Sequence, residues 1–95
     1  MIVGTLKIRA VFRDARSLKD KRQVLKGFKD RVRNKFNVSI AEVEDQDVWQ
    51  SGEIGIAAVA NDSRFVNSVL SQVADYARAC PGMEMVDHTI EIFNC

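Results

Sequence analysis

The segment at residues 17–36 constrains the fold most strongly, because its apolar residues recur with the period of an α-helix. At about 100° per residue, these side chains fall on one side of the helix. This pattern is typical of a helix that docks on a hydrophobic core. The apolar residues are Leu18, Val24, Leu25, Phe28, Val32 and Phe36. The rest of the chain must therefore supply an apolar surface for this helix to cover.

Positively charged residues recur beside that apolar side at spacings of three and four, so we expect them to form one continuous stripe. This basic stripe consists of Lys19, Arg22, Lys26, Lys29 and Arg33. It would run for roughly 20 Å along the helix at 1.5 Å per residue. It indicates contact with the phosphates of a nucleic acid, with Arg16 and Lys21 as further candidates near the helix start. One alternative is a solvated face, and another is that the protein's own carboxylates form internal salt bridges with these charges.

Lys21 differs from the stripe residues because its direction falls within the apolar side of the helix. We expect its ammonium group either to extend past the helix end or to hold an acidic residue from elsewhere in the chain.

The net charge of +1 conceals an asymmetry along the chain. Residues 1–35 hold twelve Lys and Arg and three Asp and Glu, a balance of +9. Residues 36–95 hold two Lys and Arg and ten Asp and Glu, a balance of −8. Surface ion pairs contribute only about 0–1 kcal/mol each, so they explain poorly why so many cations share one helix. The asymmetry favours an electrostatically polarised surface.

The remaining pattern predicts four strands and a second helix. Alternation predicts strands over residues 2–13, 38–43, 53–60 and 85–93, the last with Val86 and His88 in its inward register. The second helix follows the capping residues 61–63 and ends at residues 80–82. The order β-α-β-β-α-β predicts one α+β, ferredoxin-like domain over residues 1–95. Its four-stranded antiparallel sheet has strand order 4-1-3-2, with both helices on one face.

Four segments resemble the YlxP-like family of small bacterial proteins, a domain of unknown function. They are residues 17–22 (SLKDKR), 36–43 (FNVSIAEV), 45–50 (DQDVWQ) and 61–62 (ND). The resemblance covers nearly the whole chain and implies the same ferredoxin-like fold. It implies no established activity and no agreed catalytic residues. Genes of such proteins often lie beside genes for translation-initiation and ribosome-maturation factors, which associates the family with RNA or a ribosomal particle.

Three residues outside the basic stripe are candidates for contact with a partner protein. Trp49 lies in an acidic connection, where it either caps the core or anchors a partner. Ala57 and Val59 belong to a strand with small apolar residues, which permit close approach of a second copy. The alternative to RNA binding is therefore a homodimeric interaction module without a nucleic-acid role.

We expect a cytoplasmic binding protein rather than an enzyme. No metal site, cofactor or small-molecule substrate is indicated, because the single His88 and the two cysteines lack the spacing of a ligand set. An acylphosphatase would need a glycine-rich loop after the first strand, and residues 10–26 contain no glycine. No apolar run approaches the length of a membrane span, and no signal-peptide pattern is present.

Overall fold

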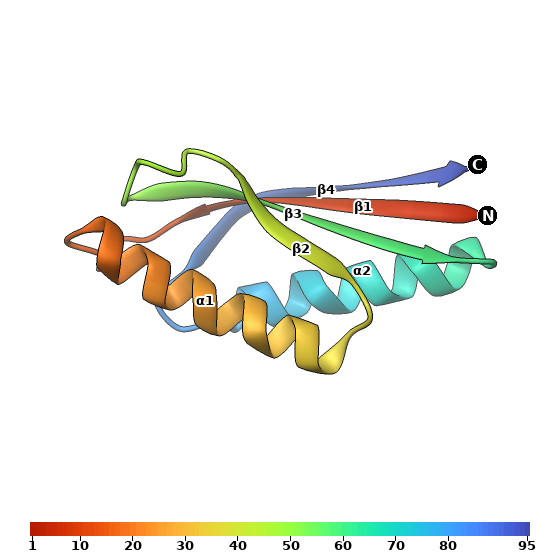
Figure 1. Cartoon of the computed structure of the whole chain (residues 1–95), viewed down its shortest axis with the longest axis horizontal. Helices are drawn as coiled ribbons and strands as arrows, with labels where there is room; N and C mark the ends of the chain where they lie inside the picture. Colours follow the sequence, from red (N-terminus) through yellow and green to blue (C-terminus); the bar gives the residue numbers. More distant parts are fainter.

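The computed structural model describes residues 1–95, and its sheet has the order β2-β3-β1-β4 with antiparallel neighbours. The elements are β1 (Ile2–Val11), α1 (Leu18–Lys35), β2 (Ser39–Glu44), β3 (Ser51–Ala60), α2 (Ser63–Arg78) and β4 (Glu84–Asn94). Both helices cover the same face of the sheet, and the opposite face is uncovered (Figure 1). The ferredoxin-like fold and the strand order predicted from the sequence are confirmed.

The hydrophobic core lies between the helices and the inner face of the sheet. Alternate residues of the two central strands point into it, as the period of two requires. They are Leu6, Ile8 and Ala10 from β1 and Ile54, Ile56 and Ala58 from β3. The helices close the core from below with Leu25, Phe28 and Val32 from α1 and Val66, Leu70, Val73, Ala74 and Ala77 from α2.

Gly4 allows α2 to pack directly on β1. A Cβ atom at this position would lie 2.3 Å from Val66 Cγ1 and 2.8 Å from Leu70 Cδ1, closer than real side-chain atoms approach. The glycine therefore fixes how near α2 lies to the central strand.

The start of α1 is capped by its own side chains. The Ser17 hydroxyl accepts a hydrogen bond from the backbone N–H of Asp20 at 3.2 Å, and the Asp20 carboxylate accepts one from the N–H of Arg16 at 2.9 Å. These bonds satisfy N–H groups that have no partner inside the helix. These two hydrogen bonds therefore fix where α1 begins, and with it the first turn that carries the basic stripe.

The inward register predicted for Val86 is wrong. A β-bulge lies opposite Arg9 and Ala10, so Met85 pairs with Ala10 and turns partly inward while Val86 is left exposed. An extra residue reverses the faces of the residues beyond it. His88 pairs with the inward-facing Ile8 and keeps the predicted register, but it is exposed because β4 is an edge strand. Neither helix has the length and apolar composition needed to cross a bilayer.

Candidate nucleic-acid interface on helix α1

The basic stripe lies largely at the surface of α1, where three of its five cations have no partner within the chain. Lys19 and Arg22 are exposed, and Lys29 is half-buried. The five ion pairs of the structure include none of these three residues. Their positive charge is therefore not neutralised by direct contact with the protein's own carboxylates.

The other two stripe residues have partners within the chain. Lys26 Nζ donates to the Asp30 carboxylate at 2.7 Å, one helical turn away, and the Lys26 side chain remains 77% exposed. Arg33 donates to the Ile40 carbonyl oxygen at 3.0 Å, which ties the end of α1 to β2. A surface pair of this spacing contributes about 0.3–0.5 kcal/mol, so Lys26 can exchange Asp30 for another anion at little cost.

The pKa of the Asp30 carboxyl is lowered by the positive charges of the stripe. The hydrogen bond from Lys26 lowers the pKa of its carboxyl below the ordinary value, and the nearby charges of Lys26, Arg33 and Lys29 lower it further. Desolvation opposes this effect but does not reverse it. A carboxylate that is stabilised in this way marks a favourable place for an anionic group from outside.

The arginines before the helix differ in their availability. Arg16 is exposed and its guanidinium has no partner, although its backbone N–H serves the cap. Arg13 hydrogen-bonds to Glu84 at the start of β4, which raises the pKa of Arg13 and lowers the pKa of Glu84. Arg16 therefore extends the cationic surface, whereas Arg13 belongs to an ion pair.

Lys21 does not belong to the interface, which corrects its assignment as a candidate phosphate ligand. Its side chain is 0% exposed, and its ammonium lies 2.7 Å from Glu42 Oε2 on β2. It also donates hydrogen bonds to the carbonyl oxygens of Asp45 at 2.7 Å and Val48 at 2.5 Å. The position of Lys21 on the apolar side of α1 was the signal for this role, and Glu42 is the acidic partner that the sequence left unnamed.

The buried ammonium organises the connection between β2 and β3. The Phe12 ring lies beneath it, with its centroid 5.7 Å from Nζ. Gly52 leaves room for the pair, because a Cβ there would approach Glu42 Oε2 to 3.0 Å and Lys21 Cε to 3.2 Å. Glu42 Oε2 is buried and accepts no well-directed hydrogen bond, so the nearby ammonium provides its compensation. Lys21 therefore fastens residues 45–48 to the start of α1.

Trp49 lies in this connection and does not cap the core. Its side chain is 43% exposed, and it is absent from the residues that pack against the core cluster. Val48 beside it is also exposed. Asp45 and Asp47 lie in the same connection, so negatively charged side chains lie close in sequence to Val48 and Trp49.

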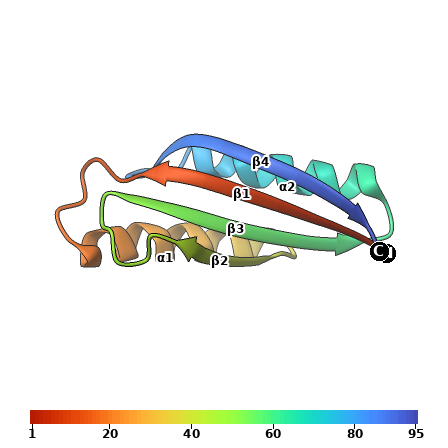
Figure 2. The ribbon, with the colours of Figure 1, turned by 90° about the horizontal axis from the view of Figure 1, so that it is seen from above.

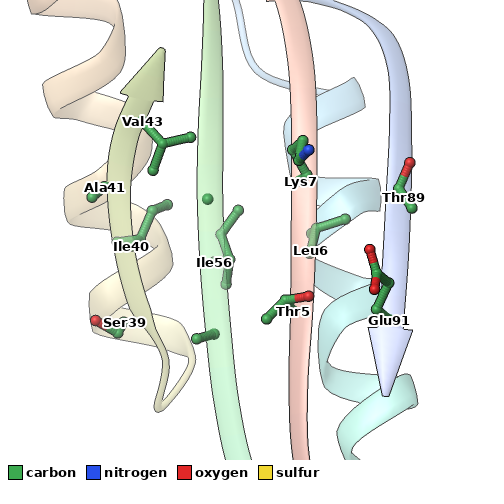
Figure 3. Close-up of a pocket in the computed structure, with 12 residues that line it drawn as sticks. Thr5, Leu6, Lys7, Ser39, Ile40, Ala41, Val43, Ile56, Thr89 and Glu91 are labelled. Atoms are coloured by element: carbon green, nitrogen blue, oxygen red, sulfur yellow. The ribbon is translucent and has the colours of Figure 1, made fainter. Parts of the chain in front are cut away.

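The two remaining candidates, Ala57 and Val59, lie on the uncovered face of the sheet. Gly55 and Ala57 line a shallow trough of about 330 Å³ on this face. Figure 3 shows further lining residues on the neighbouring strands, such as Lys7 on β1 and Val43 on β2. Val59 stands beyond the trough on β3 and is 60% exposed. No group of three or more His, Cys, Asp or Glu side chains in the structure is placed to hold a metal ion.

The family model described as "Protein of unknown function (DUF503)" matches residues 3–90. The chain belongs to the DUF503 family. It is 41% identical over 83 residues to the "Uncharacterized protein YlxP" of Bacillus subtilis (strain 168), covering 87% of this chain and 90% of that protein. The resemblance noted in the sequence is therefore confirmed.

Solved structures similar to this member of the DUF503 family support its fold. The designed protein LFR1 1, described as having a ferredoxin fold, gives a TM-score of 0.57 at 14% identity, covering 98% of this chain and 84% of that one. A C-terminal segment of the alpha subunit of aIF2 from Pyrococcus abyssi gives 0.52 at 16% identity, covering 97% of this chain and 51% of that one. At these identities the likeness concerns the fold alone.

Proposed function

We propose that this protein is a binding protein, not an enzyme, and that it contacts RNA or an RNA-rich ribosomal particle through the basic stripe of α1. The observation that carries the proposal is the set of stripe cations without an internal partner, Lys19, Arg22 and Lys29. The exchangeable Lys26 and the exposed Arg16 add to the same surface.

The mode of binding follows from what the fold offers. Protein domains that read bases on a four-stranded sheet use exposed aromatic side chains of the central strands. Here β1 and β3 contain no aromatic residue, and Phe12 just after β1 is fully buried. The interaction therefore rests on backbone phosphates and the shape of the RNA, with little selection for base sequence.

A charge-reversal pair with a matched control tests the proposal. Lys19→Glu combined with Arg22→Glu changes two exposed cations without an ion pair, and acidic residues are compatible with the first turns of a helix. Arg64→Glu combined with Arg78→Glu makes the same change in net charge on α2. Binding to structured RNA and to small ribosomal subunits is measured by filter retention and co-sedimentation.

We expect the α1 variant to lose roughly tenfold or more in affinity at moderate salt, because it replaces two attractive phosphate contacts with repulsive ones. The α2 control should bind within about twofold of the unaltered protein. Equal affinity of the α1 variant and the unaltered protein would contradict the proposal, as would equal losses in both variants. Far-UV circular dichroism establishes that both variants fold.

A further inference from the structure

The uncovered face of the sheet bears exposed apolar side chains arranged around a hollow. In Figure 2 the four strands face the viewer and the helices lie behind them. Val43, Val59 and Phe93 are 48%, 60% and 45% exposed, and they stand on three different strands. The trough over Gly55 and Ala57 lies between these protruding residues. A face with both protrusions and a hollow has the relief that a self-complementary interface requires.

The strand register places a larger side chain beside a small one in two successive rows of this face, Thr5 beside Ala57 and Lys7 beside Gly55. β1 residues pair with β3 residues as Val3 with Val59, Thr5 with Ala57, Lys7 with Gly55 and Arg9 with Glu53. A two-fold axis parallel to the strands, above the line between β1 and β3, lays β1 of one copy over β3 of the other. Each of these β1 residues pairs with a β3 residue in its own sheet, and across the interface it faces the same β3 residue of the second copy. The Lys7 stem then lies over the trough at Gly55 of the second copy, beside Val43, whose Cγ1 would lie 3.1 Å from a Cβ at that glycine.

The charges of the face are also complementary under this operation. Glu53 takes part in no ion pair within the chain, and Arg9 has only a loose contact with Asp87 at 3.6 Å between exposed side chains. The same operation brings Arg9 of one copy opposite Glu53 of the other, twice in one interface. Carboxylates on this face, such as Glu53 and Glu91, make it unsuited to a phosphate backbone, which favours a protein occupant.

We infer that the open sheet face binds a second copy of this chain, with the two sheets packed face to face. In this arrangement the ten-residue strands β1 and β3 overlap each other, and β4 overlaps the six residues of β2. At about 4.8 Å between strands and about 3.3 Å per residue, this overlap gives a footprint on the order of 500 Å² per copy. The interface then buries roughly 1,000 Å² in total, the lower limit for a specific complex. The expected product is therefore a reversible dimer with a dissociation constant in the micromolar range.

This inference does not depend on the proposed RNA binding. The helices lie on the opposite side of each sheet, so a dimer closed at the sheet faces leaves both α1 helices outside (Figure 1). Variants of the sheet face therefore test dimerisation, and variants of the basic stripe test RNA binding, each separately from the other.

Sedimentation velocity across a concentration series tests the dimer. The unaltered protein should move from the 10.7 kDa monomer towards twice that mass between roughly 1 and 300 μM. Val59→Asp should remain a monomer throughout, because it places a carboxylate in the apolar row that Val59 forms with Val3 and Phe93. Phe65→Asp on α2 is the matched control, since Phe65 is equally exposed at 60% and lies on the helical side. This control should dimerise as the unaltered protein does.

A charge exchange tests the orientation of the two copies. Arg9→Glu and Glu53→Arg should each weaken the dimer at least tenfold, and the two changes combined should restore most of the affinity. The inference is overturned if the unaltered protein is monomeric across the series, if Val59→Asp and Phe65→Asp behave alike, or if the double exchange is no better than the single changes.

Discussion

Replacement of Lys21 by methionine is the sharpest perturbation of the structure, because it removes one buried charge and nearly preserves side-chain length. The variant leaves Glu42 Oε2 without its compensating ammonium, and it leaves the Asp45 and Val48 carbonyl oxygens without their donor. Breaking a buried pair by removing one partner costs about 3–5 kcal/mol, since an uncompensated charge stays behind. The Glu42 side chain is 14% exposed, so we expect the lower part of this range.

The matched control is Lys26→Met on the same helix. Lys26 also pairs with a carboxylate at 2.7 Å, but its side chain is 77% exposed. Its loss should cost about 0.5 kcal/mol or less. For a domain of this size, the difference between the two variants corresponds to a fall in melting temperature of roughly 10–25 °C.

Urea denaturation followed by far-UV circular dichroism and by Trp49 fluorescence measures both effects. Trp49 follows the fastened residues 45–48 directly, so its emission should change in Lys21→Met before the helices unfold. Addition of Glu42→Leu to Lys21→Met should recover most of the lost stability, because no charge then remains buried. Equal free energies of unfolding for Lys21→Met and Lys26→Met would refute the reasoning.

Three further predictions concern α1 and its surroundings. Gly27→Ala should raise the free energy of unfolding by up to about 1 kcal/mol, because the new Cβ meets only a side chain at 3.9 Å; thermal denaturation measures this. Asp30→Asn should increase RNA affinity by freeing Lys26, and a filter-binding titration that shows no gain would contradict this. The hydrogen bond from Arg13 lowers the pKa of Glu84, so this carboxyl stabilises the fold above its unfolded pKa of about 4.3, and the stability is lost as pH falls through the lower folded value. Melting temperatures of Glu84→Gln should therefore fall less steeply than those of the unaltered protein below roughly pH 4.5.

The architecture was predictable from the sequence because local pattern and topology agree. The spacing of Leu25, Phe28 and Val32 matches the helical period, and their burial follows from it. Ser17 and Asp20, three residues apart at the start of α1, form its cap, and this spacing is typical of a helix start. The order of strands and helices then leaves few arrangements with right-handed connections.

Features that depend on contacts between distant residues were less predictable. The direction of Lys21 was evident, but its partner Glu42 comes from β2, and no local rule selects it among ten acidic residues of the second part of the chain. The exposure of Val86 depends on a bulge, which alternation alone does not locate. Trp49 is exposed in a connection whose backbone is held by hydrogen bonds from Lys21, a contact between distant residues that the local sequence does not reveal.

The salt dependence of RNA binding tests the central claim most directly, because it counts the phosphates that the stripe neutralises. If all five stripe cations engage, log K should fall with log salt with a slope of roughly 3.5–4.5. Lys19→Glu combined with Arg22→Glu should reduce this slope by about 1.4–1.8, while Arg64→Glu combined with Arg78→Glu should leave it unchanged. A slope near zero, or a slope that the α1 changes do not alter, would contradict the account.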